Sequence, residues 1–302
     1  MEAQFNIKST ATALLQVLAA TIGFAISLMI ANAISPMPQF ILEKTPATGF
    51  FSLPGAMIFS AIVNAVILIW AARRSSFKGV ALMGQLFVLS FGAQTLQTQI
   101  ETGYFIPAFP LLQDNFELYR LILRGLITSA VFVALVSLIV GAFSQVPRRA
   151  TNFTVNANRA VRQSAWLAAV YFVLYMLFGY FVAWQSQELR LFYGGPSELN
   201  SLVGQWMSTL MSKPELPVFQ YFRGVLWILC LVPLFKGFSG RRVELVILSA
   251  LALGLLPTAQ LAFPNPLMPA SVSIYHFWEV SISTGVFGAL CAWFVPTEAL
   301  PE

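Results

Sequence analysis

The most constraining feature of this sequence is a series of apolar runs, each about 18 to 25 residues long, separated by short polar breaks. An α-helix needs about 20 apolar residues to cross the hydrocarbon core of a bilayer. Hydrophobic residues make up 58% of the chain and charged residues 10%, whereas a soluble domain uses about 25% charged residues to cover its surface. The sequence therefore predicts an all-α, multi-pass membrane protein whose direct partner is the lipid bilayer.

Eight transmembrane helices are expected from the positions of these runs. Their ranges are 12–34, 54–72, 79–100, 118–143, 165–186, 222–238, 244–262 and 272–295. The sixth contains Pro233 and the seventh contains Pro257. A proline inside a span is tolerated where neighbouring helices or water satisfy the carbonyl that it frees, so a kink is expected at both positions.

Basic residues fall mainly on one side of the expected helices. The N-terminal segment and the loops after the second, fourth and sixth helices hold eleven of the 17 Lys and Arg residues: Lys8, Arg73, Arg74, Lys78, Arg148, Arg149, Arg159, Arg162, Lys236, Arg241 and Arg242. Because Lys and Arg are retained on the cytoplasmic side during insertion, these loops and both termini are predicted to be cytoplasmic, in the cell membrane. This distribution accounts for the net charge of +5, so no nucleic-acid partner is needed to explain it.

An internal repeat is indicated by two matching stretches. Residues 127–136 (ITSAVFVALV) match residues 282–291 (ISTGVFGALC) at an offset of 155. Shorter counterparts are Gly23-Phe24 with Gly179-Tyr180, and Arg73-Arg74 with Arg241-Arg242. The interpretation is two tandem four-helix halves, 1–150 and 151–302, inserted the same way up around a pseudo-twofold axis along the membrane normal. The alternative is chance similarity between apolar helices.

Small residues recur within the matched stretches. The pairs Gly23/Ser27, Gly179/Ala183, Ala130/Ala134 and Gly285/Ala289 each have small side chains four residues apart. Since lipid tails are as apolar as leucine, transmembrane helices associate where small side chains allow their backbones to approach. These pairs are therefore expected at helix–helix contacts.

Polar side chains form three stripes toward the outer ends of the expected helices. By helical spacing, each of the following sets shares one face: Gln94, Gln97, Thr98 and Glu101; Glu117, Arg120 and Arg124; and His276, Glu279 and Ser283. An ionised side chain within the hydrocarbon costs at least about 2.5–3.5 kcal/mol, so such residues are expected to face a partner or a water-filled cavity.

Arg124 aligns with Glu279 at the repeat offset of 155. The hypothesis is that the cation and the anion face each other across the axis, directly or through a bound solute. The alternative, which applies most readily to Glu101 and Arg120, is that long side chains near the interface extend to water and have no functional role. For His276, the lone histidine, the alternative to a ligand or proton-relay role is an ordinary hydrogen-bonding one.

Several kinds of chemistry lack their sequence signatures. With one histidine there is no HExxH zinc site and no bis-histidine haem ligation, and Cys230 and Cys291 are isolated. Neither a GxxxxGK[ST] phosphate loop nor a GxSxG serine-hydrolase motif occurs. We expect no cofactor and no metal site.

The longest external connection, roughly residues 187–221, contains the turn signal Gly194-Gly195-Pro196. Residues 198–211 follow with apolar side chains at helical spacing, which favours an interfacial helix with Trp206 at the headgroup level. Two interpretations are open: amphipathic packing alone, or a lid over the polar stripes.

Three functions are compatible with these features. The first is a carrier or binding protein for a small polar or amphipathic solute in an outward-facing polar cavity. Its candidate site residues are Gln94, Gln97, Glu101, Arg120, Arg124, His276 and Glu279. The second is a membrane-embedded enzyme that acts on a lipid or lipid-linked substrate, with Glu279 or Glu101 as general base and Arg124 binding an anionic headgroup. The third is a non-catalytic subunit whose polar stripes bind a partner membrane protein.

Overall fold

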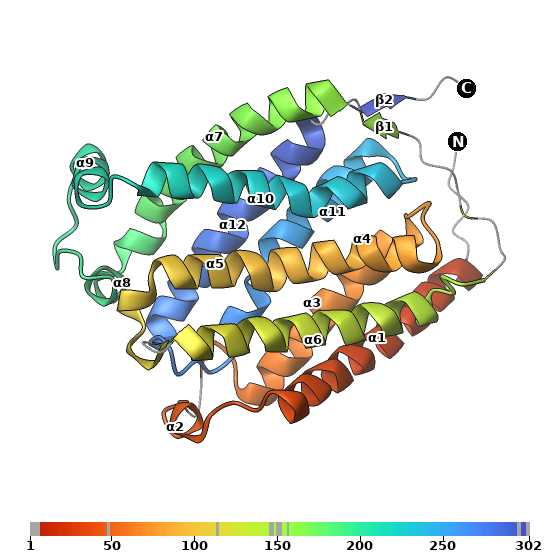
Figure 1. Ribbon diagram of the computed structural model, residues 1–302, viewed down its shortest axis with the longest axis horizontal. Helices are drawn as coiled ribbons and strands as arrows, with labels where there is room; N and C mark the ends of the chain where they lie inside the picture. The colour runs from red at the N-terminus through yellow and green to blue at the C-terminus, as the bar shows by residue number, and fades with distance from the viewer. Residues whose placement is uncertain are drawn as a thin grey trace.

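The computed structural model is a bundle of long helices (Figure 1). It describes residues 7–46, 49–112, 115–144, 148, 153–155, 157–294 and 297–299. The helices in chain order are α1 (Ile7–Ile34), α2 (Gln39–Leu42), α3 (Leu53–Arg73), α4 (Gly79–Phe91), the π-helix η1 (Gly92–Leu96), α5 (Gln97–Tyr104), the 3-10 helices η2 (Ile106–Ala108) and η3 (Pro110–Leu112), α6 (Asn115–Ile139), α7 (Ala157–Phe181), η4 (Ala183–Gln185), α8 (Gln187–Phe192), α9 (Leu202–Ser212), α10 (Leu216–Gly237), α11 (Arg242–Leu255), η5 (Ala259–Ala262) and α12 (Ala270–Phe294).

Within the described residues, seven helices are long and apolar enough to cross a membrane, which confirms a multi-pass helical protein. They are Thr10–Ile34, Leu53–Arg73, Gly79–Tyr104, Phe116–Ile139, Arg162–Gln185, Leu216–Gly237 and Ala270–Phe294. Large apolar side chains face outward from the bundle, among them Leu14, Leu18 and Ile22 on α1, each more than 60% exposed. Such outward apolar surface suits contact with lipid.

The expected span 244–262 is not one long helix. α11 has fourteen residues, or about 21 Å at 1.5 Å per residue, which is short of a hydrocarbon core of about 30 Å. The chain turns at residues 256–258 and continues as the short η5. Pro257 explains the break, because proline has no backbone N–H and disfavours a helical conformation at the residue before it. Pro233, in contrast, lies inside α10, which continues through it.

Two other helix boundaries differ from expectation for local reasons. α6 ends at Ile139 rather than at residue 143, since Gly141 adopts a positive φ of 63° and the chain turns there. α10 begins at Leu216, six residues before the expected start at 222, with Pro217 in its first turn. Proline is well suited to that position because its missing N–H would have no partner in the first turn.

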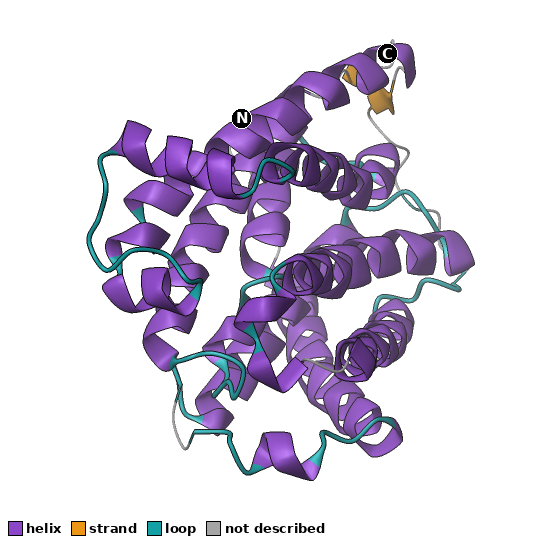
Figure 2. Cartoon of the chain, turned by 60° about the vertical axis from the view of Figure 1, so that its left-hand side comes forward, coloured by secondary structure: helices purple, strands orange, loops and turns teal. Residues whose placement is uncertain are grey.

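Helices that are far apart in sequence pack side by side (Figures 1 and 2). α1 contacts α3 and α6, while α7 contacts α10 and α12; α4 lies between α6 and α10, and α11 packs along α12. The last contact is close because a Cβ at Gly254 would lie 2.7 Å from the Ser281 carbonyl oxygen. Likewise, a Cβ at Gly224 on α10 would lie 2.9 Å from Ala168 Cα on α7. Glycine therefore permits these backbone approaches.

The expectation for Ala130 was wrong. Ala130 is exposed on the outer surface of α6, so the Ala130/Ala134 pair does not form a close helix contact there. Gly285, its counterpart on α12, does face α11, because a Cβ at this position would lie 3.4 Å from the Ala250 carbonyl oxygen. Ala130 and Gly285 therefore occupy matching sequence positions but pack differently.

One end of the bundle holds the start of α1 and the end of α12, and we call it the terminal end (Figure 1). Two strands, β1 (Phe153–Val155) and β2 (Thr297–Ala299), pair antiparallel there. The α3–α4 and α10–α11 loops also meet there, because Ser76 N donates to Gly237 O and Ser239 N donates to Arg74 O, each at 2.7 Å. We call the opposite end the cavity end, because a cavity lies there.

Candidate functional site: a polar cavity between the helices

A cavity of about 720 Å³ lies at the cavity end of the bundle. Its wall comes from both parts of the chain: α1, α3, η1, α5 and α6 from the first, and α7, α9, α10, the α11–α12 connection and α12 from the second. A volume of this size is typical of small-molecule sites, which range from about 300 to 1,000 Å³. Five of the seven sequence-predicted site residues line it: Gln94, Glu101, Arg124, His276 and Glu279.

The first polar stripe begins in the π-helix η1. The Gln94 carbonyl oxygen of η1 accepts hydrogen bonds from Thr98 Oγ1 at 2.9 Å and from Gln260 Nε2 at 3.3 Å. π-bulges in α-helices are frequent at functional sites. Since Gln94, Thr98 and Gln260 all line the cavity, the irregular backbone lies where polar groups are available to satisfy it.

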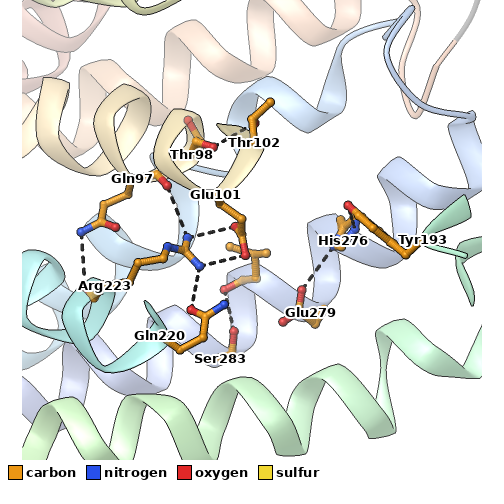
Figure 3. Close-up of polar contacts among 11 residues, drawn as sticks. Gln97, Thr98, Glu101, Thr102, Tyr193, Gln220, Arg223, His276, Glu279 and Ser283 are labelled. Atoms are coloured by element: carbon orange, nitrogen blue, oxygen red, sulfur yellow. Dashed lines mark hydrogen bonds and ion pairs between the residues drawn. The ribbon is translucent and has the colours of Figure 1, made fainter. Parts of the chain in front are cut away.

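A buried ion pair joins α5 to α10. The Arg223 guanidinium donates to both carboxylate oxygens of Glu101, at 2.8 and 2.9 Å, and its side chain is 3% exposed (Figure 3). Arg223 also donates to Gln220 Oε1 at 3.0 Å. This bidentate geometry is the strong form of the arginine–carboxylate interaction and fixes the Glu101 carboxylate at the cavity wall.

Sequence reasoning missed Arg223 as a site residue. The expected start of the sixth span at residue 222 places Arg223 at the membrane surface. With α10 starting at Leu216, Arg223 lies seven residues inside the helix, or about 10 Å. The sequence did contain a pattern that pointed to Arg223, because Gln220, Arg223 and Trp227 share one helical face. All three side chains are buried in the structure.

A hydrogen-bonded chain runs from Tyr193 through His276 to Glu279. Tyr193 Oη lies 2.9 Å from His276 Nε2, and His276 Nδ1 lies 3.4 Å from Glu279 Oε2 (Figure 3). Burial and the negative charges of Glu101 and Glu279 raise the pKa of the Tyr193 hydroxyl well above its ordinary value, so it remains a donor. With a ring hydrogen on Nδ1, His276 donates to Glu279 and accepts from the Tyr193 hydroxyl, so this tautomer satisfies both contacts.

Arg124 lies on a different wall and has neutral partners. Its Nη1 donates to Asn32 Oδ1 and to the Ser35 carbonyl oxygen, each at 3.1 Å. Glu279 has the histidine contact already described. Among the described residues, no ion pair joins Arg124 to Glu279, so the direct form of the pairing hypothesis is wrong, although both side chains line the same cavity.

Two predicted site residues do not line the cavity. Gln97 is fully buried and its Nε2 donates to the Arg223 carbonyl oxygen at 3.4 Å, so it joins α5 to α10. Arg120 lies 3.7 Å from Glu117 and 4.7 Å from the ring centre of Phe116 on its own helix. Arg120 therefore contacts residues of its own helix rather than the cavity.

The expected helix in residues 198–211 is present as α9, which begins after the capping residue Ser201. Gln205, Trp206 and Thr209 of this helix line the cavity. Trp206 therefore contributes to the cavity wall. Within the described part of the chain, no three His, Cys, Asp or Glu side chains are grouped to hold a metal ion, and Cys230 and Cys291 are free and buried.

Comparisons of the chain with protein-family models, with curated proteins and with solved structures gave no match.

Proposed function

We propose that this protein is a carrier or binding protein for a small polar or amphipathic solute, which occupies the cavity from the outer face of the cell membrane. The observation that carries the proposal is a cavity of about 720 Å³ within the bundle, lined by ionisable groups of both signs on helices that are long and apolar enough to cross a membrane. Charged side chains inside transmembrane segments are costly and mark substrate or ion pathways. Glu101, Arg124, Arg223, His276 and Glu279 are the polar residues that we assign to the solute path.

We also propose that the chain is a two-fold repeat, an arrangement that fits the same function. Helix contacts of the first half recur in the second: α1 with α3 and α6 corresponds to α7 with α10 and α12, and α4 with α6 corresponds to α11 with α12. Contacts between the halves also correspond, since α4 packs on α10 and α11 packs on α3. The paired hydrogen bonds between the α3–α4 and α10–α11 loops relate Ser76 to Ser239 and Arg74 to Gly237, both at an offset of 163.

Further sequence matches follow from this alignment. Leu53-Pro54 at the start of α3 corresponds to Leu216-Pro217 at the start of α10, and Thr95-Leu96-Gln97 corresponds to Thr258-Ala259-Gln260, all at an offset of 163. The offset of 155 found near the chain ends applies to α6 and α12, both 25 residues long. The different loop lengths around α8–α9 and around α5–η3 account for the change in offset.

The proposed repeat suggests a function for the interruption between α11 and η5. The third helix of each half is interrupted at the same level, by η1 in one half and by Pro257 in the other, and both interruptions line the cavity. Interrupted helices at corresponding positions of two repeats are typical of solute sites in transporters. We therefore propose that α11 and η5 together form an eighth crossing, with both termini cytoplasmic and the cavity facing outward.

Labelling of single cysteines tests this arrangement. Cys230 and Cys291 are buried, so their background reaction should be low. A membrane-impermeant thiol reagent added to intact cells should label Thr102→Cys, whose side chain lines the cavity, and should label Ser76→Cys at the terminal end only after permeabilisation. Leu18→Cys on the lipid-facing side of α1 is the unreactive control. Labelling of Ser76→Cys but not Thr102→Cys in intact cells would contradict the orientation and the outward cavity.

The Tyr193–His276–Glu279 chain favours a second candidate, an enzyme that acts on a lipid or lipid-linked substrate at the outer leaflet. A carboxylate oriented by a histidine is suited to general-base catalysis. Native mass spectrometry of gently extracted protein separates the two functions. A carrier should release an unaltered solute on denaturation, whereas an enzyme should convert added lipid to a product of different mass. A co-purifying stoichiometric protein would instead favour a complex subunit.

A further inference from the structure

Arg124 and Glu279 occupy equivalent places in the two halves. Each lies nine residues after the first residue of a 25-residue helix, Arg124 in α6 and Glu279 in α12. At 1.5 Å per residue both are about 14 Å along their helices, and hence at similar depth. Both line the cavity, from walls that belong to different halves of the chain.

The charge of Arg124 is not balanced by an acidic side chain among the described residues. Its two hydrogen bonds go to a side-chain amide and a backbone carbonyl, and both come from Nη1. Nε and Nη2 have no hydrogen-bond partner in the described part of the chain. A guanidinium at this depth is costly unless an anion pairs with it, and its free donors have the geometry for a carboxylate or phosphate.

The charge of Glu279 is likewise not balanced by a Lys or Arg side chain within the described ranges. Its carboxylate is 5% exposed and its hydrogen-bond partner is His276, at the long distance of 3.4 Å. The nearby Glu101 and Arg223 neutralise each other (Figure 3). Tyr193, which belongs to the same hydrogen-bonded chain, adds an aromatic ring of the kind that attracts ammonium groups.

We propose that the cavity binds a zwitterion, with its anionic group on Arg124 and its cationic group near Glu279. This proposal rests on the proposed binding function and names its substrate class. The two guanidinium and two carboxylate groups of the cavity wall sum to zero, so a ligand with both charges leaves each of them paired. A ligand with one charge leaves either Arg124 or Glu279 without a counter-ion within the membrane.

Two other features of the lining fit such a ligand. Lys213, which also lines the cavity, interacts electrostatically with Glu215, an exposed residue outside the lining, so this lysine does not alter the balance at membrane depth. Apolar lining residues such as Leu28 and Met176 suit a hydrocarbon spacer between the two charges. The expected ligand is therefore a zwitterion whose charges are separated by an apolar chain.

A series of ω-amino acids of increasing chain length measures the spacing of the two sites. Binding is followed by tryptophan fluorescence in phosphatidylglycerol nanodiscs, because Trp184, Trp206 and Trp227 line the cavity. Alkanoates, alkylamines and alcohols of the same lengths are the singly charged and neutral comparisons. We expect one chain length to bind roughly ten to a hundred times more tightly than any of these, the factor typical of a hydrogen bond to a charged group. A lysophosphatidylcholine arm distinguishes a zwitterionic lipid headgroup from a free zwitterion.

Two charge-removing variants test the assigned orientation. Arg124→Gln should lose this preference for the zwitterion and bind the alkylamine as well as it binds the zwitterion, while Glu279→Gln should do the same with the alkanoate. Retained binding of the singly charged ligand shows that each variant is folded, and Arg124→Lys should restore part of the zwitterion preference. Arg120→Gln, which lies outside the cavity lining, is the matched control and should bind like the wild type.

Three results would overturn the zwitterion assignment. The first is wild-type preference for a neutral or singly charged ligand, which leaves the binding function intact. The second is an equal loss of all ligands in both charge-removing variants, with no recovery of the zwitterion preference in Arg124→Lys. The third is binding of no compound while Thr102→Cys remains reactive from outside; an unreactive Thr102→Cys would overturn the proposed cavity function as well.

Discussion

The two partners of the Glu101–Arg223 ion pair should tolerate mutation unequally. The Arg223 side chain is 3% exposed, whereas the Glu101 side chain is 29% exposed toward the cavity. Glu101→Gln leaves a guanidinium in a dry site with neutral acceptors. Arg223→Met leaves a carboxylate that water in the cavity can solvate. The cost of breaking the pair therefore depends on which charge remains.

The exposure of the charge that remains sets the expected loss of unfolding free energy in each variant. Removing one partner from a buried pair typically costs about 3–5 kcal/mol, and we expect Glu101→Gln to fall in this range. For Arg223→Met, hydration of the exposed carboxylate reduces the expected loss to about 1–3 kcal/mol. The double variant should lose less than the sum of the single variants, because no unpaired charge remains. Arg241→Met, whose side chain is 85% exposed and whose partner Glu244 keeps its ion pair with Arg74 at 2.7 Å, should lose at most about 1 kcal/mol.

Equilibrium unfolding in mixed micelles of a mild detergent and sodium dodecyl sulfate measures these free energies of unfolding. Tryptophan fluorescence and circular dichroism should report the same transition for each variant. The reasoning is refuted if Glu101→Gln costs no more than Arg241→Met, or if the two single losses add in the double variant.

Three further perturbations have defined outcomes. Gly224→Ala should cost about 1–3 kcal/mol in the same unfolding assay because its methyl group meets the α7 backbone, whereas Gly84→Ala, with open space around it, should be neutral or stabilising. Tyr104 Oη donates to the Glu215 carboxylate at 2.7 Å and lowers the pKa of that carboxyl. The stabilisation from this hydrogen bond is therefore complete above the ordinary pKa of 4.5 and is lost as the pH falls through the lowered pKa. Tyr104→Phe should weaken the pH dependence of thermal unfolding between about pH 3 and pH 6. Thr258→Val removes a buried hydroxyl that donates at 2.7 Å and accepts at 2.9 Å, and a free-energy loss below about 0.5 kcal/mol would contradict its expected contribution of about 1–2 kcal/mol.

The sequence predicted the fold class well because the bilayer imposes a length and a polarity on every crossing. Seven expected spans have counterparts among the apolar helices. Pro257 marks an irregularity in the sequence, but the pattern alone could not distinguish a kink inside a helix, as expected at Pro233, from the break that follows α11. That outcome depends on whether neighbouring groups can satisfy the freed backbone, which is a tertiary property.

The candidate site was predictable to the extent that its residues share local helical faces. Glu101, Arg124 and Glu279 were found because charge within an apolar run is conspicuous, and all three line the cavity. Their partners were not predictable, since Arg223 meets Glu101 through the packing of α10 on α5, and Asn32 meets Arg124 through that of α1 on α6. Helical periodicity predicts which face of its own helix a side chain occupies, but it does not predict which residue of another helix that side chain contacts.

The Glu101–Arg223 contact also has a consequence for biosynthesis. The two residues are 122 positions apart, so at about 5–20 residues per second Glu101 leaves the ribosome roughly 6–24 s before its guanidinium partner. During this interval the nascent first half holds a carboxylate near the end of a membrane helix with no Arg223 to neutralise it. Its position three residues before the end of α5 allows it to remain hydrated at the lipid surface. The pair can form only after α10 has been synthesised and has packed on α5, so this link between the two halves is made after insertion of the first half.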